Sequence, residues 1–367
     1  MTDHALNAKE TKPVQVVESA FGTADGREVS LYTLTNESGL ILKVTNYGAI
    51  VTEFHVPDRT GHLGDVVAGH DKLDGYVNGI AYLGAIVGRV GNRIHHGTFE
   101  LAGKRYRLAI NDPPHHLHGG NKGWDKVVWT AEPLRDGANG PAMKFTHVSE
   151  DGEEGYPGTV MASVTYTLTN ENELKVEMQA TTDRTTIVNM AQHTYWNLAG
   201  FDSGPVLDHE LTLHADAYTP GAPIVPDGTI ESVEKTPFDF TIPKAIGKDL
   251  RSVVPAGNPA RAGYDHNFVV SGNRRALRPV ARVKSPRSGR VMTIDSNQPG
   301  VQFYAAIFLD GSITGKGHTY RQYDAFCLET QKFPNSINVP AWRDEVILEA
   351  GETDRHVMVH RFSTDSV

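Results

Sequence analysis

The chain has one cysteine among its 367 residues, Cys327, and this scarcity excludes a disulfide within the chain. Long apolar runs are also missing, because no segment reaches the roughly 20 apolar residues that a membrane-spanning helix needs. Residues 1–13 are polar and lack the apolar stretch of a secretory signal. These absences lead us to expect a cytoplasmic protein that does not contact a membrane.

An excess of basic residues is missing as well. The 35 lysines and arginines are outnumbered by 44 aspartates and glutamates, which gives a formal net charge of −9. Nucleic acids are bound mainly by clustered positive charge. We therefore expect no nucleic-acid partner.

Two glycine-rich segments stand out, but neither fits a nucleotide-binding pattern. Gly311–Gly317 (GSITGKG) has its glycines one residue too close together, and Gly317 stands where a P-loop has serine or threonine. Gly88–Arg93 (GRVGNR) has the composition of a phosphate loop, yet its spacing matches neither the P-loop nor the dinucleotide fingerprint.

Histidines are plentiful, but their spacing in sequence does not match a metal motif. His115, His116 and His118 crowd into one short run, whereas a closed zinc site needs four ligands at wider spacings. His356 and His360 fall on one face of an expected strand without an accompanying carboxylate motif. We therefore predict that the protein holds no metal.

What the chain does contain is strand-forming sequence. From Val160 to Leu168, and again from Leu174 to Ala180, apolar residues alternate with mostly polar ones on either side of a turn. This pattern is typical of a hairpin with one face in the core. A second hairpin is predicted around Gly103. Further strands are predicted at Leu40–Val56, Leu211–Ala215, Val291–Ile294, Val301–Ile307, Ala325–Leu328 and His356–Phe362.

Long helical periodicity is absent, and 36 glycines and 20 prolines divide the chain into short pieces. The expected fold class is all-β, a large antiparallel β-sandwich with few short helices. We expect residues 1–367 to form one domain with a flexible tail at 1–14. Tyr218–Gly228 and Arg251–Gly263 are expected to be surface loops.

Two residues far apart in sequence carry the most usable chemistry. His193 lies in a polar and aromatic segment, and its ordinary pKa near 6.5 allows proton transfer at neutral pH. Glu329 follows the apolar run Ala325–Leu328, and a carboxylate is costly to bury unless it is paired. Each also has a plain structural interpretation. His193 can be a hydrogen-bonded core or loop histidine, and Glu329 can end a strand and meet water.

Two further residues invite a functional interpretation. Asp265 lies in Gly263–Phe268 (GYDHNF), whose polar side chains suit sugar hydroxyls, although Gly, Asp and Asn equally favour a turn. Cys327 has the chemistry of a nucleophile, but its apolar neighbours indicate a buried small hydrophobe.

Six segments in a fixed order resemble the aldose 1-epimerase (galactose mutarotase) family. They are GRVGNRI at 88–94, LHGG at 117–120, HTYWNL at 193–198, GYDH at 263–266, PGVQFY at 299–304 and LETQKFP at 328–334. The resemblance extends from about Phe21 to Phe362. It implies a galactose mutarotase-like supersandwich with an open cleft, and an enzyme that uses no cofactor.

The resemblance also implies roles for individual residues. Glu329 matches the general base of the family and His193 matches its general acid. Sugar-binding roles are implied for five more residues: Asn92, Arg93, His118, Asp265 and Gln302. The expected reaction interconverts the α and β anomers of a free aldohexose, such as D-galactose or D-glucose, by opening and closing the ring.

The sequence departs from the family pattern at Gln192, where asparagine is usual, and at Trp196, where phenylalanine is common. Both departures leave the preferred sugar open. Three alternatives also stay open: a glycoside hydrolase using Asp265 and Glu329 as its two carboxylates, a carbohydrate-binding protein without activity, and an epimerase for a phosphorylated hexose, which needs a further cationic cluster. We expect a monomer or a homodimer.

Overall fold

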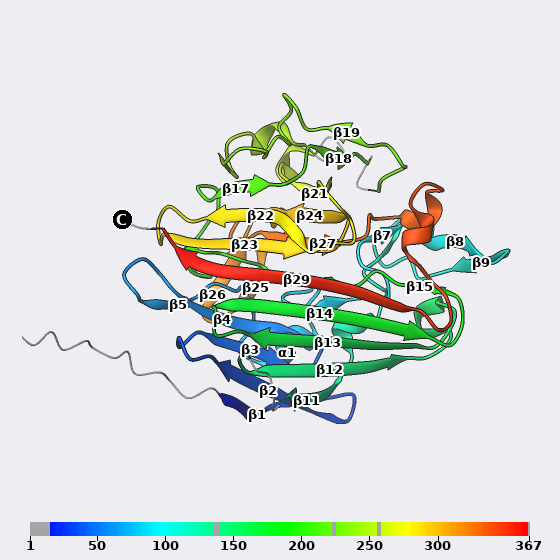
Figure 1. Ribbon diagram of the computed structural model, residues 1–367, viewed down its shortest axis with the longest axis horizontal. Coiled ribbons are helices and arrows are strands. Elements are labelled where there is room, and N and C mark those ends of the chain that lie inside the picture. The colour runs from blue at the N-terminus through cyan, green and yellow to red at the C-terminus, as the bar shows by residue number, and fades with distance from the viewer. Residues whose placement is uncertain (1–14, 135–138, 222–224, 255–257, 366–367) are drawn as a thin grey trace, which may run out of the picture.

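The computed structural model describes residues 15–134, 139–221, 225–254 and 258–365, so the predicted tail at 1–14 lies outside the described residues. Its largest sheet is antiparallel, and in Figure 1 its strands rise from β11 at the bottom to β17 near the top. In spatial order they are β11 (Thr130–Leu134), β12 (Ala142–Ser149), β13 (Val160–Leu168), β14 (Glu173–Thr182), β29 (Thr353–Thr364), β23 (Arg290–Ser296), β22 (Arg278–Lys284), β17 (Glu210–Leu213) and β20 (Lys244–Ala245).

A second antiparallel sheet is formed by the first strands of the chain. It consists of β1 (Gln15–Ala24), β2 (Arg27–Thr35), β3 (Ile41–Thr45), β4 (Val51–Pro57) and β5 (Leu63–Asp65). Phe54 of β4 meets Phe362 of β29 edge to face, with ring centroids 4.8 Å apart. The apolar face of this sheet therefore packs toward the large sheet.

A third antiparallel sheet brings together strands from the second half of the chain. Its order is β19 (Glu231–Ser232), β18 (Ala217–Thr219), β21 (Asp265–Val269), β24 (Gly300–Tyr304) and β27 (Cys327–Gln331). Every residue of β24 and β27 is buried, so both faces of these strands are covered. One cover is the large sheet, since the Thr330 hydroxyl lies 2.7 Å from Nε2 of His356 on β29.

Short ribbons and turns complete the fold. The two-stranded ribbons pair β6 (Ile86–Val87) with β16 (Ala191–Gln192), β7 (Arg93–Ile94) with β10 (His116–Leu117), β8 (Thr98–Leu101) with β9 (Lys104–Arg107), β15 (Thr186–Ile187) with β28 (Ile347–Leu348), and β25 (Asp310–Gly315) with β26 (His318–Arg321). Within the described residues, the helical segments are α1 (Leu73–Val77) and the 3₁₀ turns His95–Gly97, Trp124–Lys126, Glu153–Gly155, Leu250–Ser252, Pro259–Arg261, Ser336–Asn338 and Arg343–Glu345.

One large apolar core lies between the three main sheets. It draws on Phe54 from the second sheet, on Val164 and Met358 from the large sheet, and on Phe268 and Phe303 from the third. Along β13 and β14 buried residues alternate with half-buried or exposed ones, because one face of an antiparallel strand faces the core and the other does not. Burial of this interior supplies the main stabilisation of the fold.

The expected all-β fold with large antiparallel sheets is confirmed, as are both predicted hairpins. One prediction was wrong in part: the surface loop expected from Tyr218 begins inside β18, because Tyr218 and Thr219 pair with Phe268 and Asn267 of β21. In the expected loop at Arg251–Gly263, two 3₁₀ turns, Leu250–Ser252 and Pro259–Arg261, occupy part of the described backbone.

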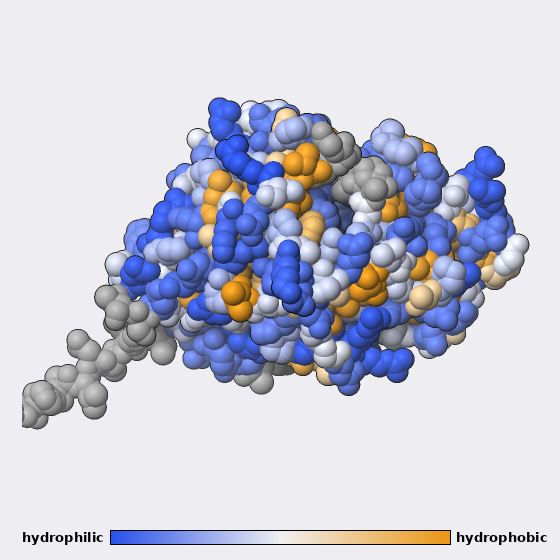
Figure 2. Space-filling view, turned by 90° about the horizontal axis from the view of Figure 1, so that it is seen from above, coloured by the Kyte–Doolittle hydropathy of each residue, from blue (hydrophilic) through white to orange (hydrophobic). Residues whose placement is uncertain are grey.

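The apolar residues on the visible surface are scattered, and the described helices are short. Figure 2 looks down on the molecule from the top of Figure 1 and shows separate apolar patches divided by polar residues. Within the described ranges, no helix has the length and apolar character needed to cross a membrane.

Candidate active site

A cavity of about 520 Å³ lies where the third sheet meets the loops around β6, β7 and β10. Its volume suits a small organic ligand such as a monosaccharide. Six of the seven site residues predicted from the sequence line it: Asn92, Arg93, His118, His193, Asp265 and Glu329. The seventh, Gln302, is not among the lining residues.

Glu329 is placed by the middle of β27. Strand side chains alternate, so Cys327, Glu329 and Gln331 share the face of β27 that is turned away from Thr330 and the large sheet. Glu329 is only 2% exposed, which rules out the interpretation of this residue as a strand end that meets water. Its Oε2 atom has no hydrogen-bond partner among the described residues. This oxygen is therefore free to accept a proton from a ligand.

His193 is placed by the short ribbon that precedes it. Its backbone N–H donates to the carbonyl of Ala85, and its carbonyl accepts from the N–H of Gly84. Three residues later, Trp196 and Phe326 exchange both backbone hydrogen bonds. This bridge docks the loop that carries His193 beside β27, and so two segments more than 130 residues apart face each other.

The imidazole of His193 contacts groups on both of its nitrogens. Nε2 lies 3.5 Å from Oε1 of Glu329, and Nδ1 lies 3.6 Å from Sγ of Cys327. Burial raises the pKa of the Cys327 thiol well above its usual range, so the thiol stays protonated and can donate to Nδ1. In that arrangement the ring proton of neutral His193 lies on Nε2, toward Glu329.

Burial also dominates the protonation of the pair itself. It raises the pKa of Glu329 well above its ordinary value, and the nearby charge of Asp265 raises it further, while Arg93 lowers it. Burial lowers the pKa of His193 to about 4. Both shifts disfavour the charged form, so the two groups are held as a closely spaced pair that shares protons.

His118 faces the cavity as a neutral donor. Its Nδ1 accepts the backbone N–H of Asn92 at 3.0 Å, so Nε2 carries the ring proton. Burial, with the neighbouring His193 and Arg93, lowers the pKa of His118 well below the ordinary value. A neutral N–H donor of this kind suits a sugar hydroxyl oxygen.

Arg93 and Asp265 form the charged part of the cavity wall. The Nε of Arg93 donates to Asp112 at 2.7 Å, and one of its terminal nitrogens lies 4.0 Å from Asp265. Asp265 in turn accepts a hydrogen bond of 2.7 Å from Nε2 of Gln302. Gln302 is thus placed behind Asp265, where it orients the carboxylate.

Glycines bring the two halves of this wall together. Gly119 has a left-handed backbone, with φ of +89°, and a Cβ there would collide with the carbonyl of Gly88. A Cβ at Gly88 would in turn collide with the indole of Trp124. These contacts explain Gly88 of GRVGNR and Gly119 of LHGG, whose loops carry Asn92, Arg93 and His118.

Several aromatic residues of the cavity were not predicted from the sequence. Tyr82 lies over His118 with ring centroids 4.6 Å apart, Tyr195 stacks on His193 at 5.1 Å, and Tyr304 meets His193 edge-on at 6.3 Å. Tyr195 and Tyr304 belong to motifs that were recognised, so their positions beside predicted site residues were a usable signal. Tyr82 has no such neighbour in the sequence.

Other residues singled out in the sequence serve the structure. Arg89 of GRVGNR is 2% exposed and donates to the carbonyls of Ser149, Pro157 and Gly158. Lys316 of GSITGKG pairs with Asp65 at 2.7 Å. Neither cation is available to a phosphate.

The two departures from the family pattern lie outside the cavity lining. Gln192 bonds to the hydroxyl of Thr194, and Trp196 is buried against His360 and Phe362. Neither residue therefore reshapes the cavity directly.

Three of the cavity residues have ligand atoms close enough to hold a metal. The groups of His118, His193 and Glu329 lie within 4.8 Å of one another. The Nδ1 of His118 is already occupied by the backbone of Asn92, and the three groups equally suit direct hydrogen bonding to a sugar.

Comparisons with known proteins agree over nearly the whole chain. Residues 30–361 match the model of the family described as aldose 1-epimerase. The chain is 44% identical to the galactose mutarotase of Bos taurus over 326 residues, 88% of this chain and 91% of that protein. It is 35% identical to the aldose 1-epimerase of Haemophilus influenzae over 89% of this chain and 93% of that protein.

A solved structure shows the same architecture. The galactose 1-epimerase of Lactobacillus acidophilus superposes with a TM-score of 0.85 at 28% identity, covering 96% of this chain and 100% of that chain. All the residues that line the cavity fall inside the range matched by the family.

Proposed function

Since this chain belongs to the aldose 1-epimerase family and is an isomerase of that activity, we propose that Glu329 is its general base and His193 its general acid. The observation that carries this assignment is the 3.5 Å contact between Nε2 of His193 and Oε1 of Glu329 beside the cavity. Ring opening moves protons at two oxygens bonded to the same carbon. The acid and the base must therefore lie close together.

The reaction proceeds by two coupled proton transfers. The carboxylate of Glu329 takes the proton of the anomeric hydroxyl, and Nε2 of protonated His193 gives a proton to the ring oxygen. The bond between C1 and the ring oxygen breaks, and an open-chain aldehyde forms. Rotation about the C1–C2 bond presents the other carbonyl face, and the reverse transfers close the ring as the other anomer.

The pair suits this task because it can hold one proton between its two members. Ring opening needs one protonated and one unprotonated group, and ring closure needs them exchanged. Burial disfavours a charge on either group, so it weakens the preference that water gives to the carboxylate and imidazolium ion pair over the neutral pair.

The remaining cavity residues are proposed to hold the sugar. His118 offers a neutral N–H donor, Arg93 offers a cation fixed by Asp112, and Asp265 offers an acceptor fixed by Gln302. Such directional partners restrict the pose of the sugar and keep its anomeric centre at the pair. Asn92 also lines the cavity and completes the proposed set.

The proposed substrate is a free aldohexose such as D-galactose or D-glucose. Among the aspartate, glutamate, lysine and arginine side chains of the lining, the acidic ones outnumber the basic ones, with Asp112, Asp265, Asp310 and Glu329 against Arg93 and Lys126. A phosphorylated sugar carries about two negative charges and favours a cationic wall. The charge of this cavity therefore supports a neutral sugar over a phosphorylated one.

All the groups proposed to touch the sugar come from one chain. Catalysis then needs no residue from a partner, which supports the proposal of a monomer or a homodimer of independent sites. A protein with one buried cysteine also suits a reducing compartment such as the cytoplasm.

Polarimetry on freshly dissolved α-D-galactose and α-D-glucose tests the function. The wild-type protein should speed the approach to the same final rotation that the uncatalysed reaction reaches. Glu329→Gln and His193→Asn should each lower kcat by at least about 100-fold, as expected for the loss of a positioned acid or base. His214→Asn, at an exposed histidine outside the cavity lining, is the matched control and should keep full activity.

Near-normal turnover in a folded Glu329→Gln or His193→Asn variant would remove that residue from its proposed role. Unchanged anomer exchange with added wild-type protein would contradict the proposed substrate class. Hexose 6-phosphates are the next sugars to assay in that case.

A further inference from the structure

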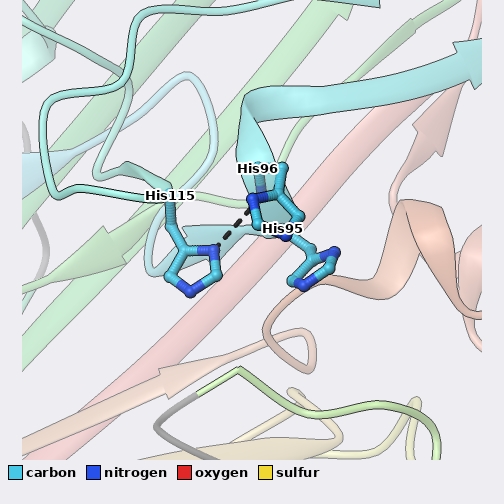
Figure 3. A group of neighbouring side chains, drawn as sticks. All are labelled: His95, His96 and His115. Atoms are coloured by element: carbon cyan, nitrogen blue, oxygen red, sulfur yellow. Dashed lines mark hydrogen bonds between the residues drawn. The ribbon is translucent and has the colours of Figure 1, made fainter.

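A cluster of three histidines lies close to the sugar-binding wall but outside the cavity lining. His95 and His96 follow β7, and His115 precedes β10, as Figure 3 shows. The ring centroids are 4.0 Å apart for His95 and His96, 5.2 Å for His95 and His115, and 5.4 Å for His96 and His115. One potential ligand atom from each residue lies within 4.8 Å of the other two.

The local backbone places two consecutive histidines on the same side of the chain. Neighbouring residues of a strand point in opposite directions. The chain leaves the strand after Ile94, and His96 adopts a left-handed backbone with φ of 49°. The Asn335 side chain accepts the backbone N–H of His95 at 3.0 Å and holds this turn in place. The cluster is therefore built by a fixed turn.

His115 differs in its hydrogen bonding from the structural histidine beside it. His116 is fully satisfied, with Nδ1 2.8 Å from the Ala109 carbonyl and Nε2 2.6 Å from the Tyr156 hydroxyl. His115 is also buried, at 5% exposed, yet its Nε2 has no partner among the described residues. Its Nδ1 accepts only a long bond of 3.2 Å from the N–H of His96. Hydrogen bonding thus gives little reason for a histidine at position 115.

The same long bond decides which nitrogen of His115 is available. Because Nδ1 accepts a hydrogen bond, it carries the lone pair, and the ring proton lies on Nε2. Figure 3 shows this accepting nitrogen turned toward the other two rings. A bound species that accepts the lone pair of Nδ1 replaces one weak hydrogen bond. The ring proton of His115 can stay on Nε2 when it binds.

We propose that His95, His96 and His115 form a binding site for one divalent transition-metal ion of the zinc, nickel or copper type. Imidazole nitrogens favour these ions, whereas magnesium and calcium favour oxygen ligands. Ligand nitrogens around zinc lie about 3.3 Å apart when the zinc–nitrogen bonds are about 2.0–2.1 Å long. His95 and His96 are exposed, so their rings can turn and close this small gap.

The site lies one step along the ribbon that carries the sugar-binding residues. In the β7–β10 pair, Ile94 faces His116 and Arg93 faces Leu117, so His95 and His115 continue the ladder on one side. Asn92 and His118 continue it on the other side, where they line the cavity. A bound ion would link the two strands at the end opposite the sugar.

Isothermal titration of the untagged, metal-free protein with zinc chloride tests the site. We expect one ion per chain, no heat from magnesium chloride, and affinities at least about tenfold weaker in His95→Gln and His115→Gln. His62→Gln, an exposed histidine outside the cluster, is the matched control and should bind zinc like the wild type. The two cluster variants should keep mutarotation activity, because neither residue lines the cavity, and this shows that they fold.

Two other groups of side chains could take the ion, and the titration distinguishes them. Saturating D-galactose should compete with zinc only if the ion sits at His118, His193 and Glu329, and His55→Gln should weaken binding only if it sits at Glu53, His55 and Asp65. Zinc binding that galactose or His55→Gln abolishes would overturn the proposal. Binding unchanged in His115→Gln, or absent up to about 1 mM zinc, would overturn it as well.

Discussion

At the scale of the residue, the proposed base Glu329 lowers the stability of the fold at neutral pH. The unfolded chain loses the proton of Glu329 near the ordinary pKa of about 4.5, whereas the buried carboxyl keeps its proton to a higher pH. Stability is therefore lost as the pH rises from the unfolded pKa through the folded one. The proposed base is thus a source of instability at neutral pH.

Replacing Glu329 by a side chain that cannot ionise should therefore stabilise the fold. Glu329→Gln should raise the melting temperature at pH 7, because glutamine neither takes up a proton on folding nor buries a charge, while the variant loses activity. Glu53→Gln is the matched control, and it should change the melting temperature in the opposite direction. Burial of Glu53 raises its pKa, but hydrogen bonds from His55 and Lys43 outweigh burial and lower it to about 2. Scanning calorimetry should show a lower melting temperature for Glu53→Gln, and a lower one for Glu329→Gln would contradict the argument.

Sequence motifs predicted the identity of individual site residues but not the partners of their side chains. Glu329 and His193 were identified by the resemblance, and their chemistry alone left a plain structural interpretation for each. Gln302 was matched to a sugar-contacting position, but its amide is directed at Asp265. A motif fixes which residue occurs at a position, whereas the partner of its side chain depends on the neighbouring strand.

At the scale of the element, the site depends on two loops that touch through glycine. The loop after β6 carries Asn92 and Arg93, and the loop after β10 carries His118. They meet where Gly119 rests on the carbonyl of Gly88. The close approach also allows Nδ1 of His118 to accept the backbone N–H of Asn92.

Gly119→Ala should therefore lower both stability and activity. Gly103→Ala is the matched control, because Gly103 also has a positive φ, of +74°, but nothing lies within 4 Å of its Cβ position. The control should cost about 1 kcal/mol, the strain of a left-handed alanine. Gly119→Ala should cost more and raise the KM for galactose, because the displaced loop moves His118. Denaturant unfolding and polarimetry measure both effects, and equal losses in the two variants would exclude the contact as the cause.

At the scale of the whole molecule, buried histidines make the fold sensitive to acid. Burial lowers the pKa to about 4 in four buried residues: His193, His209, His356 and His360. In the unfolded chain these side chains bind protons near pH 6.5. Between about pH 6.5 and pH 4 these four side chains therefore bind more protons in the unfolded state, and their contribution to stability falls as the pH falls. Glu329 and Asp125, whose pKa values burial raises, contribute with the opposite sign, but the four histidines outnumber them.

We predict that the melting temperature drops between pH 7.5 and pH 5. The free energy of unfolding should be lower at pH 5 by an amount on the order of several kcal/mol. The change from pH 7.5 to pH 8.5 is the control, since these histidines stay neutral there. Calorimetry should show a single cooperative transition if residues 1–367 form the one domain expected from the sequence. A melting temperature that is unchanged or higher at pH 5 would contradict the prediction.

The sequence by itself determined the class of fold and the chemical groups available. Alternation along Val160–Leu168 and Leu174–Ala180 is a local property, because the two faces of a strand meet core and solvent in turn. It gave the hairpins without knowledge of their neighbours. The six ordered motifs gave the family and the residues proposed for the site.

Only the tertiary structure decided which of these groups meet. His193 faces Glu329 because Trp196 bridges to Phe326, and His95 and His96 approach His115 because β7 pairs with β10. The histidine run at 115–118 therefore did not indicate the metal site proposed here. Such contacts depend on pairing between distant segments, and the energy of that pairing comes from burial of a shared core rather than from any local pattern.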